Sequence, residues 1–226
     1  MIKNISNLGD AALYCDFGKE VNKDTNTKVI RYFKSIQKAN VEGVNNLTPS
    51  YNKLIVSFDL RKTNYKDIKK KIESLHIDIE NNLENNKLEI PICVDESFAL
   101  DIKRLEEKLK ISREIIYENF FKKEFFCYMT GFIAGMPFLG DLDNNMRVKR
   151  LETPRVKVPK GSVGLTEQFA NIYTFESPGG WNILGNTPLK IFDQKNETKP
   201  TLINPGDKVL FYQISKKEYL KFNDKK

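Results

Sequence analysis

The sequence predicts an α+β domain at residues 1–87, followed at residues 88–226 by an antiparallel β-barrel or β-sandwich domain with helices at its start. In the first part, strand and helix patterns alternate with short connections, an order typical of small α+β domains. From residue 125 onward, short apolar runs are separated by Gly, Pro and Asn, as in antiparallel barrels and sandwiches. Residues 80–87 are polar and rich in Asn, with little to bury, so we expect a linker there.

The first domain is expected to contain two strands and two helices in the order βαβα. Residues 11–17 form an apolar run that ends at Gly18, and residues 54–58 are rich in β-branched and aromatic side chains, so both predict strands. Each run is followed by apolar residues at helical spacing, which predicts a helix. The helix residues are Val29, Ile30, Phe33 and Ile36 after the first strand, and Tyr65, Ile68, Ile72 and Leu75 after the second.

The second domain is expected to open with a strand and two helices. Residues 88–94 are apolar, and Pro91 among them favours the edge of a sheet, because proline cannot donate to a ladder. Residues 97–101 begin the first helix, and Ser112 is a good N-cap for the second. The side chains expected to face inward are Ile102, Leu105 and Leu109 in the first helix, and Ile115, Ile116, Asn119 and Phe120 in the second. Within residues 202–211, a Pro-Gly-Asp turn is expected to join two strands.

Composition argues against a nucleic-acid-binding or membrane protein. The formal charge is +7, but no helix-turn-helix, zinc-finger spacing or paired aromatic platform accompanies the dispersed lysines. The longest apolar stretch, residues 125–139, is too short and too interrupted by Gly and Pro to span a bilayer. Three widely spaced cysteines without a CxxC pair indicate reduced thiols and a cytoplasmic protein. The single histidine, His76, has no second His or paired Cys nearby, so no metal site is expected.

The most distinctive local motif surrounds the only Trp of the chain. Ser177, Pro178, Gly179 and Gly180 immediately precede Trp181. Paired glycines allow positive φ and a close approach of the backbone to a neighbour. The motif therefore fits either a tight turn plugged by a half-buried Trp, or one wall of a ligand cleft in which the indole offers an apolar face and an N–H donor.

Two arginines are candidates for holding an acidic ligand. Arg150 and Arg155 lie in a basic segment that prolines interrupt. An arginine fork binds a carboxylate or phosphate bidentately, but it also clamps backbone carbonyls around irregular loops, and the sequence leaves both roles open. No catalytic residue can be assigned. The sequence contains neither a GxxxxGK[ST] loop nor a GxGxxG motif after a strand, so no nucleotide cradle is recognised.

Several turn motifs nevertheless follow one another in an order that covers nearly the whole chain. They comprise Gly131-Phe132, Phe138-Leu139-Gly140, Arg150, Pro154-Arg155, Val158-Pro159, Gly161-Ser162-Val163-Gly164, Ile172-Tyr173, Ser177-Pro178-Gly179-Gly180-Trp181, Gly185-Asn186-Thr187-Pro188 and Pro205-Gly206-Asp207. Less specific matches in the first half include Asp16-Phe17-Gly18 and Pro49-Ser50-Tyr51. In these motifs the chain resembles the B subunit of bacterial 5-oxoprolinase, also called allophanate hydrolase subunit 1, a carboxyltransferase-domain family related to a sporulation-kinase inhibitor.

This resemblance implies a cyclophilin-like β-barrel after the α+β domain. It also implies assembly with a C subunit of similar barrel architecture and with an A subunit, in a complex that uses ATP to hydrolyse 5-oxoproline to glutamate. The ATP belongs to the complex, since no cofactor is evident on this chain. The family resemblance further implies a cleft for a small amide or lactam. Its candidate residues here are Arg150, Arg155, Ser177, Pro178, Gly179, Gly180 and Trp181.

Several positions depart from the family pattern around the implied cleft. Ala134 and Met136 replace the Pro and the second Phe of Gly-Phe-x-Pro-Gly-Phe, and Phe120 stands where a helix usually carries His. The family's Gly-Gly-x-Gln-Thr-Gly aligns with residues 166–171, so that Phe169 takes the place of the Gln. Phe cannot supply the hydrogen bonds of an amide. Either the ligand chemistry is altered or lost, or the cleft accepts a different, more apolar substrate.

Two functions from different classes remain open. The first is an enzyme subunit of a 5-oxoprolinase or a related amide hydrolase. The second is a non-catalytic binding protein that inhibits a sensor histidine kinase, because docking a partner helix needs only surface. An exposed apolar patch on the barrel, rather than a polar cleft, would favour the second function.

Overall fold

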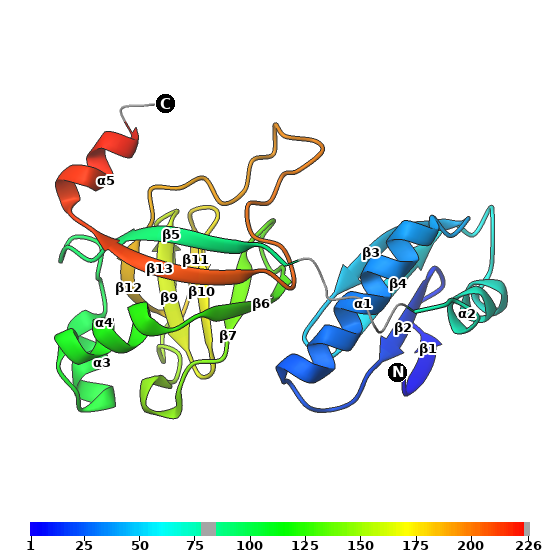
Figure 1. Ribbon diagram of the computed structural model, residues 1–226, viewed down its shortest axis with the longest axis horizontal. Coiled ribbons are helices and arrows are strands. Elements are labelled where there is room, and N and C mark those ends of the chain that lie inside the picture. Colours follow the sequence, from blue (N-terminus) through cyan, green and yellow to red (C-terminus); the bar gives the residue numbers. More distant parts are fainter. Residues whose placement is uncertain (78–84, 224–226) are drawn as a thin grey trace. The chain divides into compact units, whose positions relative to one another are not determined.

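The computed structural model describes residues 1–77 and 85–223, and the predicted linker at residues 80–87 lies outside this range except for its last three residues. The chain forms two compact units, Met1–Glu84 and Asn85–Lys226 (Figure 1). Each unit has a hydrophobic core of its own.

The first unit is a four-stranded antiparallel sheet with two helices. Its strand order is β1-β2-β4-β3. The elements are β1 (Asn4–Asn7), β2 (Ala12–Asp16), α1 (Lys23–Ala39), β3 (Val44–Pro49), β4 (Lys53–Phe58) and α2 (Tyr65–Glu73). Every second residue of β4 is buried, which places one face of the sheet on the core. Asn22 and Asn64 cap α1 and α2, each accepting a hydrogen bond from a backbone N–H in the first turn.

The predicted order βαβα lacked β1 and β3. Both strands lie at the edges of the sheet, where β2 and β4 pair with them on one side only. Their sequences, NISN and VNNLTP, contain few apolar residues. Backbone hydrogen bonds hold such edge strands, and side-chain patterns do not reveal backbone pairing. The two predicted helices are present, and their buried positions include Val29, Ile30, Ile36, Ile68 and Ile72.

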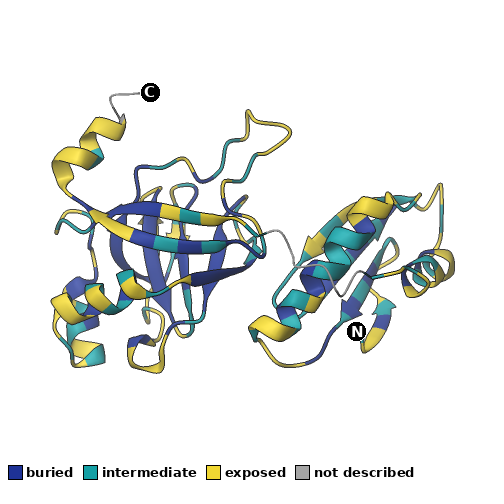
Figure 2. Cartoon of the chain, viewed as in Figure 1, coloured by how far each residue is buried: buried dark blue, intermediate teal, exposed yellow. Residues whose placement is uncertain are grey.

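The second unit is a closed seven-stranded barrel with the order β10-β7-β6-β13-β5-β12-β9. Its strands are β5 (Lys87–Cys93), β6 (Phe125–Thr130), β7 (Pro137–Gly140), β9 (Ser162–Thr166), β10 (Phe169–Ile172), β12 (Asn182–Asn186) and β13 (Lys208–Ile214). A separate two-stranded sheet pairs β8 (Arg155–Val158) with β11 (Ser177–Gly179). The barrel strands are largely buried (Figure 2).

The barrel is mixed rather than antiparallel. Strand β13 runs parallel to β5 along seven residue pairs, from Lys208 opposite Lys87 to Ile214 opposite Cys93, whereas the other barrel pairs are antiparallel. Turn signals reveal only hairpins between strands that are close in sequence. The parallel pair joins distant strands, so the prediction of a wholly antiparallel barrel was wrong.

Two further expectations about strands were wrong. Strand β5 lies between β13 and β12 and is not at an edge, despite Pro91. Pairing with β12 is confined to Asn186 opposite Cys93, so most of β5 is hydrogen-bonded to a neighbouring strand on one side only. A proline, which has no N–H to donate, is tolerated there. The Pro-Gly-Asp turn leads into β13, but the segment before it forms only an isolated bridge between Phe192 and Thr201.

Three helices accompany the barrel: α3 (Ile102–Leu109), α4 (Arg113–Lys122) and α5 (Lys216–Asn223), together with a short 3₁₀ helix, η1 (Asn144–Met146). Ser112 occupies the N-cap position of α4, as expected. In α4, Ile116 and Phe120 are buried in the barrel core, but Ile115 is 45% exposed, contrary to the prediction. The last helix, α5, is largely exposed (Figure 2).

Candidate functional site

A small cavity of about 100 Å³ lies against the barrel wall, at the motif around Trp181. The residues that line it come from β7, β10 and β11, from the loop before β7, from the segment before β8, and from the positions just after β10 and β11. Its lining residues are Phe132, Met136, Phe138, Arg150, Asn171, Tyr173, Gly179, Gly180 and Trp181. Drug-sized ligands occupy pockets of roughly 300–1,000 Å³, so this cavity suits a smaller molecule.

Strand alternation explains why these side chains meet outside the barrel core. In β10, Ala170 and Ile172 belong to the core cluster, so Asn171 between them faces the opposite side. In β7, Leu139 belongs to the core and Phe138 faces away from it. The cavity therefore lies on the outer side of the wall formed by β7 and β10.

Trp181 is one wall of the cavity. Its side chain is only 5% exposed, and the edge of the Phe138 ring meets it with centroids 5.6 Å apart. The Arg150 guanidinium carbon lies 5.8 Å from the centroid of the indole ring, within the range of a cation–π contact. Within the described ranges, no carboxylate lies within ion-pair distance of Arg150. The cavity thus combines aromatic walls with a cation that can receive an anion.

The Ser-Pro-Gly-Gly segment is not a tight turn. Its first three residues, Ser177–Gly179, form strand β11, and Gly180 connects this strand to Trp181. Neither Gly179 nor Gly180 has a positive φ, so the expected special backbone conformation is absent there. Gly179 is required for another reason: a Cβ atom at this position would lie 2.1 Å from the hydroxyl of Tyr173. At Gly180 the nearest atom to such a Cβ would be 3.6 Å away, an ordinary contact. One of the two glycines therefore permits a close approach.

Two polar groups complete the cavity. Burial raises the pKa of Tyr173, against the opposing effect of a hydrogen bond from the Asn171 side chain, so the hydroxyl is protonated at neutral pH and can donate. Asn171 is 1% exposed, and its Nδ2 lies 3.6 Å from Sδ of Met136. Its Oδ1 has no hydrogen-bond partner among the residues that the structure describes. Sequence reasoning did not select Asn171 or Tyr173, although a polar residue within an apolar strand was the available signal.

Of the seven predicted cleft residues, four line the cavity: Arg150, Gly179, Gly180 and Trp181. Ser177 and Pro178 lie just before them in β11, and Pro178 is exposed. Arg155 is held elsewhere, because one of its terminal nitrogens, Nη2, contacts Asp101 Oδ1 at 2.5 Å. Asp101 is 6% exposed and also accepts a hydrogen bond from the backbone N–H of Ile183 at 2.7 Å. This geometry is that of an arginine clamp within the fold.

Known proteins share the sequence features of this chain. Residues 3–203 match the family described as carboxyltransferase domain, subdomain C and D. The chain is 31% identical to the B subunit of 5-oxoprolinase from Bacillus subtilis (strain 168), with 95% of this chain and 94% of the relative covered. It is 30% identical to the B subunit of 5-oxoprolinase from Haemophilus influenzae, with 92% and 96% covered. The chain belongs to the carboxyltransferase-domain family, subdomains C and D.

A solved structure is similar as well. The crystal structure of TTHA0988 superposes with a TM-score of 0.82 and 27% identity over 91% of this chain. This chain spans only 40% of that longer polypeptide. The carboxyltransferase-domain fold of the two proteins is therefore shared, and in TTHA0988 it is part of a larger chain.

The family positions that differ in this chain have distinct surroundings. Phe120, where the family usually has His, is fully buried and stacks on Phe211 with ring centroids 4.9 Å apart. Ala134 is exposed, and its carbonyl accepts a hydrogen bond from Thr174. Of the altered residues, Met136 lines the cavity, whereas Phe169 is not among its lining residues and packs against the Tyr128 ring at 5.5 Å. Phe120 is thus a core residue here.

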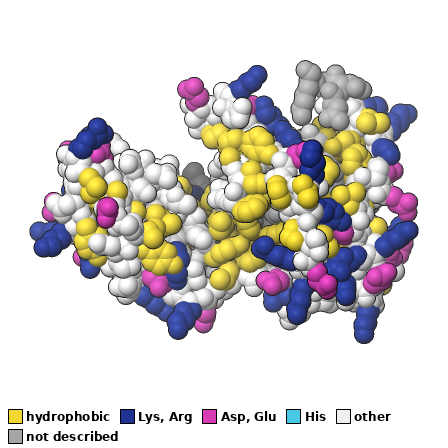
Figure 3. Space-filling model, turned by 180° about the vertical axis from the view of Figure 1, so that it is seen from behind, with side chains coloured by type: hydrophobic (Ala, Val, Ile, Leu, Met, Phe, Trp, Pro, Cys, Tyr) yellow, Lys and Arg dark blue, Asp and Glu magenta, His cyan; other side chains and the backbone are white. Residues whose placement is uncertain are grey.

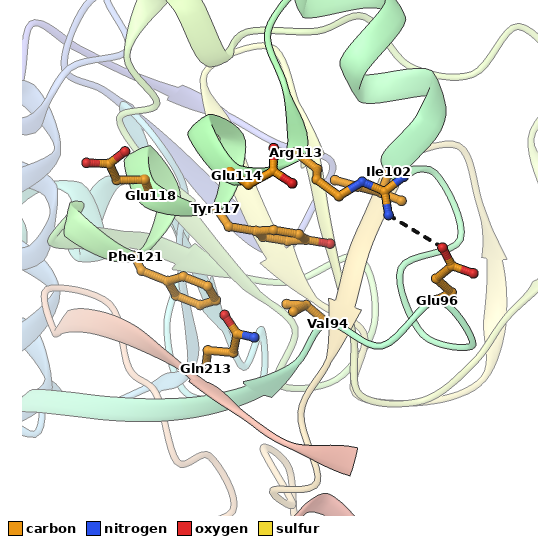
Figure 4. A pocket seen from close by; sticks show the side chains of 9 residues that line it. All are labelled: Val94, Glu96, Ile102, Arg113, Glu114, Tyr117, Glu118, Phe121 and Gln213. Atoms are coloured by element: carbon orange, nitrogen blue, oxygen red, sulfur yellow. Dashed lines mark hydrogen bonds and ion pairs between the residues drawn. The ribbon is translucent and has the colours of Figure 1, made fainter.

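A second hollow, of about 510 Å³, lies beside α4 (Figure 4). Its walls include Val94, Tyr117 and Phe121, and the last two rings stack at 6.0 Å. Arg113 at its margin is paired with Glu96 at 3.4 Å and with Glu106 at 3.3 Å. We call this hollow the α4 groove; it is larger than the cavity at Trp181, and apolar side chains form part of its wall.

A further hollow, of about 630 Å³, lies on the first unit, where Lys28, Arg31 and His76 are among the residues that line it. On the face shown in Figure 3, Lys and Arg side chains are interspersed with Asp and Glu. His76 is exposed beyond the end of α2. In residues 1–77 and 85–223, no three His, Cys, Asp or Glu side chains are grouped as a metal ion would require. No helix within these ranges is long and apolar enough to cross a membrane.

Proposed function

We propose that the chain is the B subunit of a multi-subunit, ATP-dependent 5-oxoprolinase, which converts 5-oxoproline to glutamate, or of a related hydrolase of small amides or lactams. The observation that carries this proposal is near full-length similarity, at 30–31% identity, to two proteins named as B subunits of 5-oxoprolinase. The proposed partners are a C-subunit-like barrel protein and an A subunit. ATP is used by the complex, and the proposed compartment is the cytoplasm.

The cavity at Trp181 supports this proposal through its size and chemistry. A small lactam carrying a carboxylate is amphipathic, and the cavity offers aromatic walls together with Arg150. In the proposed complex, Arg150 holds the carboxylate and Trp181 packs against the ring. Arg155 has no direct role in this arrangement, because Asp101 already binds it.

The test is reconstitution with the products of the neighbouring genes, followed by an assay of 5-oxoproline-dependent ATP hydrolysis and glutamate formation. An Arg150→Gln variant should raise KM for 5-oxoproline by roughly 10- to 100-fold, as expected for loss of a hydrogen bond to a charged group. Arg61→Gln is the control, since the Arg61 side chain is 89% exposed and pairs only locally with Asp59. An intact complex without turnover would contradict the proposed activity.

A second candidate function is supported by the α4 groove. An apolar groove is the usual receptor for one face of an amphipathic helix. The α4 groove offers Val94, Tyr117 and Phe121 as apolar contacts for such a helix. We propose as the alternative that the chain is a non-catalytic binding protein that inhibits a sensor histidine kinase. A pull-down from cell extract that recovers a histidine kinase and no C-subunit-like protein would favour this alternative.

A further inference from the structure

We propose that a second copy of this chain docks on the α4 groove through its own α5, so that two copies form a reciprocal dimer. The receptor is the α4 groove, and the docking element is the face of α5 that carries Lys217, Leu220 and Lys221. Both halves of the interface are present on one chain. This inference does not depend on the proposed hydrolase function, and it gives the groove an occupant other than a kinase helix.

The outward face of α5 carries an apolar side chain between two lysines. Tyr219 faces the barrel unit, because its hydroxyl donates to Asn186 Oδ1. Lys217, Leu220 and Lys221 are spaced by three and four residues, so they share a face of the helix that points away from Tyr219. Leu220 is 52% exposed. Within residues 1–77 and 85–223, neither lysine forms an ion pair, so this face can receive a partner.

The α4 groove combines apolar and acidic side chains on one helix. Tyr117 and Phe121 point from α4 toward Val94, and they form the apolar part of the groove (Figure 4). Glu114 and Glu118, each three residues before one of these rings, also line the groove and are exposed. The groove is therefore suited to an apolar side chain that is accompanied by cations.

Both carboxylates of α4 are charged at neutral pH. Hydrogen bonds from Ser112 and Lys122 lower the pKa of Glu114 and of Glu118, respectively. The pair between Glu118 and Lys122 is exposed, and such pairs contribute at most about 1 kcal/mol, so another cation can replace Lys122 at little cost. Arg113 at the margin of the groove is already engaged by two other glutamates. The rim therefore attracts a positively charged helix.

The charged positions of the two helices match in spacing. Lys217 and Lys221 are four residues apart on α5, and Glu114 and Glu118 are four residues apart on α4. Four residues of helix correspond to about 6 Å. Two helices laid side by side therefore bring both lysines opposite both glutamates in a single register. Leu220, which lies between the lysines, then enters the apolar part of the groove and loses its contact with water.

The arrangement closes on two copies. Because each chain carries both halves of the interface, a two-fold axis fills both grooves at once and leaves no groove for a third copy. Each interface consists of one short helix in one groove. We therefore expect a dimer whose population rises with protein concentration, as for other small interfaces.

Sedimentation velocity of the full chain over a wide range of protein concentration tests the dimer. Wild type should pass from monomer to dimer. Leu220→Glu should raise the dimer dissociation constant at least about tenfold, because it removes the buried apolar side chain and adds a negative charge beside two glutamates. Leu60→Glu is the matched control, since Leu60 is 56% exposed on the first unit, and it should dimerise as wild type does. A monomer at every concentration, or a dimer that Leu220→Glu leaves intact, would overturn the inference.

Charge reversal tests whether α5 and α4 are the elements that meet. Lys217→Glu combined with Lys221→Glu should weaken the dimer about tenfold or more, because like charges then face each other. Adding Glu114→Lys and Glu118→Lys to the same chain should restore it, since opposite charges face each other again. Failure of this restoration in a variant that circular dichroism shows to be folded would overturn the α4 groove as the receptor.

The control for the reversed lysines lies on the first unit. Lys66 and Lys70 are exposed and also four residues apart on a helix, α2, so Lys66→Glu combined with Lys70→Glu changes the net charge equally. This variant should dimerise as wild type does. Weakening equal to that of the α5 variant would show a general effect of net charge and would overturn the specific pairing.

A zero-length carbodiimide crosslink provides a direct readout, because it joins a lysine amine to a carboxylate without a spacer. In a mixture of isotopically labelled and unlabelled chains, mass spectrometry should find linked peptides from α5 and α4 in which one peptide is labelled and the other is not. Links within one chain only would show that α5 reaches the groove of its own copy, and this result would overturn the reciprocal dimer.

Discussion

Gly179 shows how a single missing side chain can define a site. Its strand and the Tyr173 ring approach so closely that no Cβ atom fits between them. The neighbouring Gly180 has ordinary surroundings, although the two residues look equivalent in the sequence. The functional meaning of a glycine pair therefore depends on what lies opposite each member, which the sequence does not state.

This difference gives a prediction for two alanine substitutions. Gly179→Ala should displace the Tyr173 hydroxyl and destabilise the barrel unit by about 1–3 kcal/mol, the usual cost of overpacking. Gly180→Ala should cost much less, because the nearest atom lies 3.6 Å from the added Cβ. Urea unfolding followed by Trp181 fluorescence measures both. Equal losses for the two variants would contradict the close approach at Gly179.

The pairing of Asp101 with Arg155 gives a second prediction. Asp101→Ala removes the partner of Arg155 and the acceptor for the Ile183 N–H, and it should cost about 3 kcal/mol or more. Glu176→Ala is the control, because its ion pair with Lys157 is exposed and such pairs contribute at most about 1 kcal/mol. Chemical denaturation provides the measurement. A stable Asp101→Ala protein would free Arg155 for the ligand role that the sequence left open.

Part of the site could be predicted from sequence and part could not. The motif at Trp181 and Arg150 were identified because glycines, the only Trp and an arginine are conspicuous residue types. Asn171 was not selected, since its role depends on the face of β10 that it occupies. Arg155 resembled Arg150 in sequence, and only its distance to Asp101, 54 residues away, distinguishes them. Long-range contacts of this kind leave no local pattern.

The terminal helix α5 is attached to the barrel unit by a few polar contacts. Lys216 Nζ lies 3.0 Å from Asp95 Oδ1, and the Tyr219 hydroxyl donates to Asn186 Oδ1 at 2.8 Å. The Tyr219 ring also contacts Phe98, with centroids 4.5 Å apart. Most of the helix is otherwise exposed. Asp95 thus takes part in one of the few contacts that hold α5.

The pKa of Asp95 makes this attachment pH-dependent. Hydrogen bonds from the Ser97 hydroxyl and backbone, followed by Lys216, lower the pKa of Asp95 from 3.8 to about 2. A depressed folded-state pKa stabilises the protein above the unfolded value, and this contribution is lost as pH falls from about 4 to about 2. Asp95→Asn should therefore lower Tm at pH 6, and the difference from wild type should shrink near pH 2.

Lys216→Met provides the matched control for this pH profile. It removes the ammonium group that helps to lower the pKa of Asp95 and keeps both hydrogen bonds from Ser97. Its Tm difference from wild type should be smaller than that of Asp95→Asn at pH 6. Thermal melts across pH 2–7 measure both variants. A Tm difference for Asp95→Asn that stays constant over this range would contradict the role of the carboxylate.

For the molecule as a whole, local patterns predicted the elements better than their arrangement. The helices α1 to α4 and strands β2, β4 and β5 follow from the spacing of apolar residues and from caps. The closure of the barrel depends on the parallel pairing of β5 with β13, and no turn motif in the sequence predicts this pairing. Edge strands β1 and β3 carry polar sequences and were missed. Topology is determined by backbone pairing between strands that are far apart in the sequence, and side-chain composition does not predict which strands pair.

The two units should differ in folding rate for the same reason. The first unit is built from hairpins and nearby pairings, whereas the barrel closes between residues about 120 apart, as in the bond from Asn86 to Asp207. Non-local pairing slows folding. In stopped-flow refolding, far-UV circular dichroism should show an earlier phase that Trp181 fluorescence lacks, because the only Trp lies in the barrel unit. Identical kinetics for the two probes would contradict this expectation.

The parallel partner of β5 also has a consequence on the ribosome. Synthesis proceeds at roughly 5–20 residues per second, so the separation of 121 residues between Asn86 and Asp207 corresponds to a wait of about 6 to 24 s. During that wait Ile90 and Ile92, which are buried in the finished barrel, have no β13 to pair with. The nascent chain therefore exposes an apolar strand for several seconds. A chaperone that binds exposed apolar segments would act on the chain mainly in that interval.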